Sequence, residues 1–184
     1  MFKITKEKIL NECDTALNCV DEAAVEDLIK RIMDADKVFF VGVGRVKLSL
    51  EAFAKRLNHL GISAHVVGDI NEPAMTDRDL LIVGSGSGES LVPVAIARKA
   101  KEIGGSVVHI GSNSSSTIAS MADLMVRIPV QTKLYLKDEI QSEQPMSSLF
   151  EQSLLLLADT VSMMIVEKNN VDIKSLWQFH ANLE

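Results

Sequence analysis

The stretch that decides the fold is Leu80-Leu-Ile-Val-Gly84-Ser-Gly-Ser-Gly88-Glu-Ser90. Its first four residues form a short, continuous apolar run, which is typical of a buried strand in a parallel sheet. Glycines and serines alternate after this run. Helical periodicity then continues from Ser90 to Ile103, where Gly104-Gly105 ends it. The stretch therefore predicts a strand, a loop and a helix in direct succession, as in one half of a β-α-β unit.

The same alternation of strands and helices continues on both sides of this stretch. Short apolar runs predict four more strands, at residues 37–43, 63–67, 106–110 and 124–128. Helical periodicity predicts helices at residues 5–33 (with a break near 21–24), 48–60, 117–121 and 147–168. Alternating strands and helices form a parallel sheet with helices on both faces. We therefore expect an α/β fold with a five-stranded parallel sheet, doubly wound and flavodoxin-like or Rossmann-like.

The length of the chain fits a single domain over residues 1–184. We divide it into N-terminal helices at residues 1–36, an α/β core at 37–128 and C-terminal helices at 147–184. Residues 129–146 contain two prolines and many polar side chains, which predicts a long loop. Long loops in compact domains are often functional, so this segment is a candidate part of a site.

Composition and charge exclude several classes of protein. The net charge is −6, and nucleic-acid backbones and acidic membranes are bound through clustered Lys and Arg, so we expect neither partner. The first eight residues lack the apolar core of a signal peptide. The most apolar stretch, Leu149 to Val166, is interrupted by polar residues, as in a buried helix rather than a membrane span. Two cysteines are too few for a disulfide framework or a zinc site. Because neither a signal peptide nor a membrane span is predicted, the expected location is the cytoplasm.

The glycine-serine loop has the composition of an anion site. Glycines such as Gly88 let backbone N–H groups turn toward an anion, and the following helix N-terminus adds positive potential. Ser85, Ser87 and Ser90 add hydroxyl donors. The alternative is a plain turn in which Ser90 or Ser87 caps the helix, but three serines exceed what a cap needs.

The loop differs from nucleotide-binding loops. A P-loop needs a Lys-Ser/Thr pair after its last glycine, and here Glu89-Ser90 follows Gly88. We expect the Glu89 carboxylate to lie beside the anion, where it would disfavour a triphosphate and suit a monophosphate.

A second loop, Gly42-Val-Gly44-Arg45-Val-Lys47, follows the first strand. A dinucleotide fingerprint needs a third glycine where Lys47 stands, so NAD is not expected. One interpretation is a tight strand-to-helix turn. In the other, Gly44 allows close approach of the backbone and Arg45 faces an anion.

Glu151 stands near the start of the long apolar helix. A carboxylate in this position could act as a general base. The spacing from Ser148 to Glu151 is also that of a capping box, and from spacing alone the cap is the favoured interpretation. The four histidines, His59, His65, His109 and His180, show no spacing that indicates a metal site, and none is expected.

Six segments carry more information together: Phe39-Phe-Val-Gly-Val-Gly-Arg45, Phe53-Ala-Lys-Arg-Leu-Asn-His-Leu-Gly61, Val67-Gly68, Gly84-Ser-Gly-Ser-Gly-Glu89, Gln144-Pro-Met-Ser-Ser-Leu-Phe-Glu-Gln152 and His180-Ala-Asn-Leu-Glu184. In order and spacing they resemble the 6-phospho-3-hexuloisomerases, a family of the sugar isomerase (SIS) domain group. The Ser-Gly-Ser-Gly-Glu loop marks the whole group, and the last two segments are much more specific to the family.

The resemblance implies an isomerase without metal or redox cofactor. Such an enzyme converts 3-hexulose 6-phosphate to fructose 6-phosphate by moving a proton between adjacent carbons through a cis-enediol. The resemblance places the phosphate on Ser85, Ser87 and Ser90 and makes Glu151 the base. It gives His180 a role in ring opening or proton transfer, supplied across a subunit contact. It also implies a homotetramer built as a dimer of dimers.

One departure from the family pattern concerns the second loop. The family has Gly-x-Gly-Arg-Ser-Gly, whereas this chain has Val46 and Lys47 at the last two positions. Val46 removes a hydroxyl, and one lost hydrogen bond costs about 0.5–1.5 kcal/mol, so we expect the phosphate site to survive. Two alternatives remain: an isomerase of a different sugar phosphate, and a non-catalytic phosphosugar-binding module that would not need Glu151 or His180.

Overall fold

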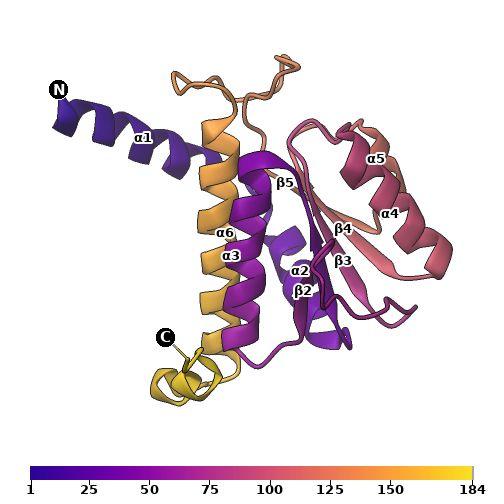
Figure 1. Ribbon diagram of the computed structural model, residues 1–184. Coiled ribbons are helices and arrows are strands. Elements are labelled where there is room, and N and C mark those ends of the chain that lie inside the picture. Colours follow the sequence, from indigo (N-terminus) through magenta and orange to yellow (C-terminus); the bar gives the residue numbers. More distant parts are fainter. Residues whose placement is uncertain (184) are drawn as a thin grey trace.

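The computed structural model describes residues 1–183 and contains a five-stranded sheet in the order β2-β1-β3-β4-β5 (Figure 1). The strands are β1 (Val38–Val41), β2 (Ala64–Val66), β3 (Leu80–Gly84), β4 (Ser106–Gly111) and β5 (Leu124–Arg127). All neighbouring strands are parallel. This is the flavodoxin-like order, in which the connections reverse direction between β1 and β3. The predicted fold class is therefore confirmed.

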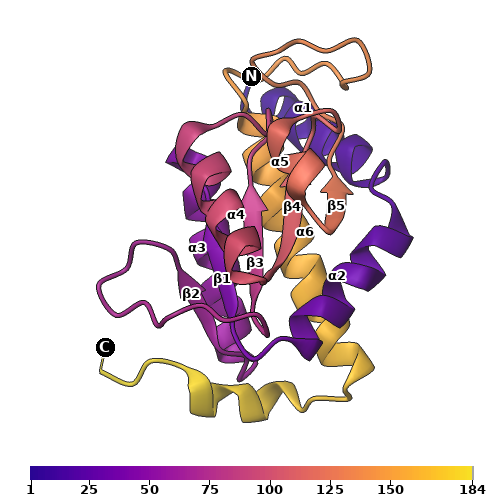
Figure 2. The same ribbon diagram turned by 90° about the vertical axis from the view of Figure 1, so that its right-hand side faces the viewer.

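Helices cover both faces of the sheet. They are α1 (Phe2–Leu17), α2 (Glu22–Asp34), α3 (Gly44–His59), α4 (Leu91–Ile103), α5 (Thr117–Met121) and α6 (Ser148–Lys168), followed by a 3₁₀-helix η1 (Ile173–Phe179). Alternate strand residues point to opposite faces. Phe40 and Ile82 belong to the core under α2, α3 and α6, whereas Phe39 and Leu81 belong to the core under α4 and α5. Figures 1 and 2 show these two helical layers, with α1 extending away from the sheet.

Helix α6 lies alongside α3 (Figure 1). By length and composition it could span a membrane, but 56% of its apolar window is buried inside the domain. It is therefore a core helix, as the polar residues in its sequence predicted. Leu155, Leu156 and Met163 remain exposed on its outer side.

Two predicted boundaries were wrong. The break was expected near residues 21–24 and lies at residues 18–21, between α1 and α2. Asp21 is the N-cap of α2, and its side chain accepts a hydrogen bond from the Ala23 N–H at 3.0 Å. Helix α3 begins at Gly44 rather than at Leu48. Its first turn carries the polar residues Arg45 and Lys47. The apolar periodicity from which the helix was predicted begins only at Leu48, so the sequence pattern missed this first turn.

Candidate active site

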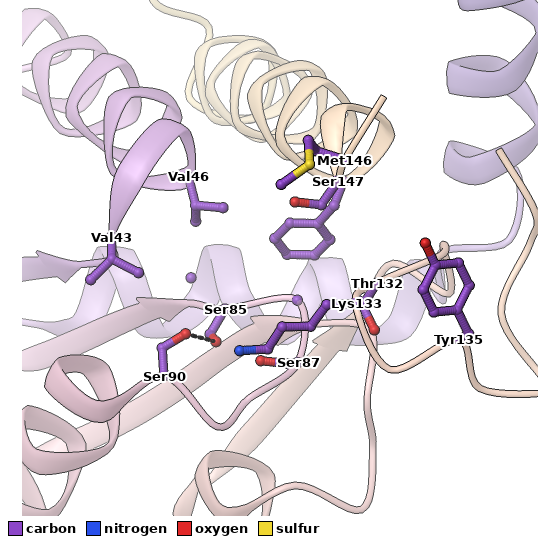
Figure 3. Close-up of a pocket in the computed structure, with 13 residues that line it drawn as sticks. Val43, Val46, Ser85, Ser87, Ser90, Thr132, Lys133, Tyr135, Met146 and Ser147 are labelled. Atoms are coloured by element: carbon purple, nitrogen blue, oxygen red, sulfur yellow. Dashed lines mark hydrogen bonds between the residues drawn. The ribbon is translucent and has the colours of Figure 1, made fainter. Parts of the chain in front are cut away.

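A cavity of about 340 Å³ opens at the carboxyl ends of β1 and β3. This is the edge where open parallel sheets bind ligands, and the size suits a small metabolite. Figure 3 shows the serine loop on one side, the start of α3 with Val43 and Val46 on another, and the start of α6 with Ser147 opposite. The long loop 129–146 closes the remaining side with Thr132, Lys133 and Tyr135.

The serine loop presents its hydroxyls to this cavity. Ser85, Ser87 and Ser90 all line it. Ser90 occupies the N-cap position of α4, but its side chain makes no capping hydrogen bond. Its Oγ instead accepts a hydrogen bond from the Ser85 Oγ at 3.3 Å (Figure 3). The interpretation of Ser90 as a plain helix cap is therefore wrong.

Gly88 gives the loop its tight turn. Its φ is 66°, in the region that side chains rarely adopt, and its N–H donates to the Ser85 Oγ at 3.1 Å. A Cβ added here would lie 2.0 Å from the Ser116 Oγ. Only glycine fits this position, so Gly88 shapes the site through its backbone.

His109 supports the loop from the sheet below. It is fully buried in β4, and its Nε2 lies 2.9 Å from the carbonyl oxygen of Ser85. Because a carbonyl only accepts, Nε2 carries the proton and donates it. The neighbouring Gly111 leaves room for the ring, since a Cβ there would lie 2.2 Å from the His109 Nε2. Sequence reasoning gave His109 no role, and no spacing in the sequence indicates this contact.

We expect His109 to make the protein less stable in acid. Burial lowers its pKa from the ordinary value of 6.5, so below about pH 6.5 the unfolded chain binds a proton that the folded chain does not. The free energy of unfolding should therefore decrease as the pH falls below about 6.5. His109→Gln keeps an N–H donor but does not titrate. Denaturant unfolding between about pH 5 and 8 should show a shallower pH dependence for this variant than for the wild type, and equal slopes would refute the assignment.

Glu89 does not lie beside the cavity, contrary to the sequence-based expectation. Its carboxylate accepts hydrogen bonds from the N–H and the hydroxyl of Thr117, both at 2.7 Å, at the start of α5. These two bonds lower the pKa of Glu89. The side chain therefore joins α5 to the loop and does not line the cavity.

Glu151 forms an ion pair with Arg45. The carboxylate is buried, and its Oε2 lies 2.5 Å from the Arg45 Nε. The N-cap of α6 is Ser147, not Ser148, so the predicted capping box is absent and this interpretation was wrong. The Arg45 guanidinium therefore orients the Glu151 carboxylate, which does not cap the N-terminus of α6.

The Arg45–Glu151 pair lies next to the serine cavity rather than in it. Both side chains line a smaller depression together with Leu48 and Leu155. The preceding residue on α6, Phe150, lines the serine cavity. The starts of α3 and α6 thus separate the serine cavity from the depression that holds the carboxylate. Gly44, with a φ of 59°, begins the turn that brings Arg45 toward α6.

The two residues that depart from the family pattern have different surroundings. Val46 lines the serine cavity, where a Cβ added to Gly84 would lie 3.0 Å from its Cγ1. Lys47 lies 3.6 Å from Glu51 in an ion pair on α3. Val46 therefore makes one wall of the cavity apolar, and the Lys47 charge stays outside.

His180 lies at the opposite end of the domain from Glu151. It follows η1, and its ring stacks on His59 at 5.3 Å and packs against Trp177 at 5.2 Å. Glu151 is in the first turn of α6, so about 25 Å of helix separates the two positions. One chain does not bring the two predicted catalytic residues together. Glu184, the last residue of the quoted tail segment, lies outside the described residues.

Sequence reasoning missed the details of the long loop. Glu139 is buried and accepts hydrogen bonds from Thr132, through its N–H at 3.1 Å and its hydroxyl at 2.8 Å. Lys133 follows Thr132 and lines the serine cavity. The loop was predicted to be functional from its length and polarity, but neither signal identified these residues.

Comparisons with known proteins show the family to which the chain belongs. The SIS domain model matches residues 31–158. The chain is 38% identical to a 3-hexulose-6-phosphate isomerase of Bacillus subtilis, over 96% of each chain. It is 39% identical to the enzyme of the same name from Mycobacterium gastri, over 93% of this chain and 85% of the relative.

A solved structure gives the same result. A hypothetical protein of Methanococcus jannaschii, for which a molecular function of 3-hexulose-6-phosphate isomerase was inferred, superimposes with a TM-score of 0.84. Its sequence is 31% identical, and the match covers 98% of this chain and 99% of that one. The similarity therefore extends over the serine loop, both helices of the carboxylate pair and the C-terminal tail.

Proposed function

This chain belongs to the SIS-domain family, among its 3-hexulose-6-phosphate isomerases, and from this premise we propose that it is a phosphosugar isomerase that interconverts 3-hexulose 6-phosphate and fructose 6-phosphate. The observation that carries the proposal is the pairing of two sites within one edge of the sheet. A cavity with three serine hydroxyls suits the phosphate, and a buried, ion-paired carboxylate lies beside it.

The serine loop is the proposed phosphate site. Helix α4 begins directly after Ser90, which lines the cavity, and the free N–H groups at a helix N-terminus favour an anion. Ser87 and Ser90 supply hydroxyl donors, and the loop backbone is held by His109 and Gly88. Because Glu89 is turned toward α5, the carboxylate of the loop does not line the cavity in which the phosphate is proposed to bind.

Glu151 is the proposed base. It removes the proton from C2 of 3-hexulose 6-phosphate, next to the C3 carbonyl, and a cis-enediol forms across C2 and C3. The C3 oxygen gains a proton, the C2 hydroxyl loses one, and returning a proton to C3 completes fructose 6-phosphate. Arg45 holds the carboxylate in place for this transfer. Proton transfer by a positioned side chain contributes about 10²–10⁴-fold to a rate.

His180 is proposed to come from a neighbouring subunit. Its distance from Glu151 along the helix excludes a shared site within one chain. Leu48 and Leu155 are exposed beside the carboxylate, and exposed apolar residues around a functional depression are typical of a subunit contact. We include a homotetramer, built from paired dimers, and a cytoplasmic location in the same proposal.

The test of the function is a ligand panel combined with a turnover assay. Thermal shifts with fructose 6-phosphate, a pentulose phosphate and unphosphorylated fructose establish the ligand class. Stabilisation only by the phosphorylated sugars supports the phosphate site. Formation of fructose 6-phosphate is then followed in a coupled assay. Binding of phosphosugars without turnover of any of them would select the sensing module instead.

A further inference from the structure

Lys133 is the one cationic side chain that lines the serine cavity in the described part of the chain. It is exposed, and none of the ion pairs found within residues 1–183 includes it. In Figure 3 its side chain extends from the long loop toward the serine loop. A lysine ammonium that has no carboxylate partner and faces hydroxyl groups is suited to bind an anion.

The backbone next to Lys133 is fixed to the core of the domain. The preceding Thr132 donates its N–H and its hydroxyl to the Glu139 carboxylate. That carboxylate also accepts from the Leu136 N–H at 2.9 Å and from the Ser112 hydroxyl at 3.2 Å. Because Ser112 directly follows β4, Glu139 ties the long loop to the sheet edge that carries the site. The backbone at Lys133 is therefore held at the edge of the serine cavity, while its side chain has no ion-pair partner among the described residues.

The positive charge of Lys133 matters for anion binding because the rest of the chain is acidic. The chain carries a net charge of −6, so its overall field repels a phosphate. The carboxylates nearest to the site are directed elsewhere, with Glu89 bound to Thr117 and Glu151 to Arg45. Hydroxyls and backbone N–H groups supply only partial charges, whereas a sugar phosphate carries close to two negative charges at neutral pH. The cavity has one full positive charge to offset them.

We propose that Lys133 binds the phosphate group of the ligand from the side opposite the serine loop, so that the anion is held between the two loops. The proposal rests on the proposed function in taking a sugar phosphate as the ligand. It adds a specificity-determining residue that neither the serine motif nor the carboxylate pair contains. Its prediction is that Lys133 contributes to the affinity for phosphorylated sugars and contributes nothing to proton transfer.

The test is titration calorimetry with fructose 6-phosphate on Lys133→Met, Lys133→Arg and Lys137→Met. Lys137 is an exposed lysine of the same loop that does not line the cavity, so its variant is matched in charge. Hydrogen bonds to charged groups are strong, and we expect Lys133→Met to bind about tenfold to a hundredfold more weakly. Lys137→Met should stay within about twofold of the wild type, and Lys133→Arg should recover most of the loss.

Two readouts separate this role from a structural one. The difference between wild type and Lys133→Met should shrink as salt is raised, because an open cavity lets ions screen the charge. In the turnover assay the variant should raise KM and leave kcat close to that of the wild type. Equal affinities for wild type and Lys133→Met would overturn the proposal, even if the enzyme turns over. Loss of affinity in a protein without turnover would support the Lys133 proposal and refute the isomerase function.

Discussion

Replacing Glu151 with glutamine is expected to lower kcat by about a thousandfold, because glutamine cannot accept the substrate proton. Fructose 6-phosphate should bind almost as well as to the wild type, since the serine cavity lies beside the carboxylate and does not include it. The variant leaves Arg45 without a charged partner. That side chain is 68% exposed, so water replaces the partner at little cost in stability. Initial rates and calorimetric affinities measure both effects.

The matched control is Glu167→Gln, near the other end of the same helix. Glu167 is exposed and far from both depressions, so its variant should keep the wild-type rate and affinity. Unfolding temperatures of both variants show whether the fold is intact. Turnover within about threefold of the wild type in Glu151→Gln would remove Glu151 from the mechanism.

A second expected result is that two inactive variants regain activity when they assemble together. His180→Asn and Glu151→Gln should each lose most turnover. Glu151 lies in the first turn of α6, and His180 follows η1 beyond the other end of that helix, so the proposed complete site takes Glu151 from one subunit and His180 from another. In a random 1:1 assembly, about one quarter of such sites combine both intact residues. Co-expression should therefore restore about a quarter of the wild-type rate.

The control for this experiment is a pair of tags, one on each variant. Purification through both tags shows that mixed assemblies have formed. Mixed assemblies without restored activity would contradict a site shared between subunits. Near-wild-type activity of His180→Asn alone would show instead that the stack with His59 and Trp177 is structural.

Local patterns were sufficient to predict the sheet. Runs such as Leu80 to Val83 are short, apolar and followed by glycine, and this combination favours a buried parallel strand. The position of the serine loop could be predicted in the same way. Glycines and serines between a strand and a helix lie at the carboxyl end of that strand, which is the edge where open parallel sheets bind ligands. Both features depend on residues that are close together in the sequence.

Contacts between distant residues could not be predicted in the same way. Glu151 has the spacing of a cap, and only the folded chain shows that Arg45, far away in the sequence, takes its carboxylate instead. Glu89 likewise belongs to the serine loop in sequence, but its carboxylate bonds to Thr117. The contact of His109 with Ser85 and the place of Lys133 at the cavity depend on how β4 and the long loop pack near the serine loop.

The most direct test of the account is the rate at which the purified protein forms fructose 6-phosphate from 3-hexulose 6-phosphate. We expect product formation that is proportional to enzyme concentration and is lost in Glu151→Gln, while that variant still binds fructose 6-phosphate. Binding of fructose 6-phosphate by the wild type with no product above the uncatalysed rate would contradict the account, and the protein would then be a phosphosugar-binding module.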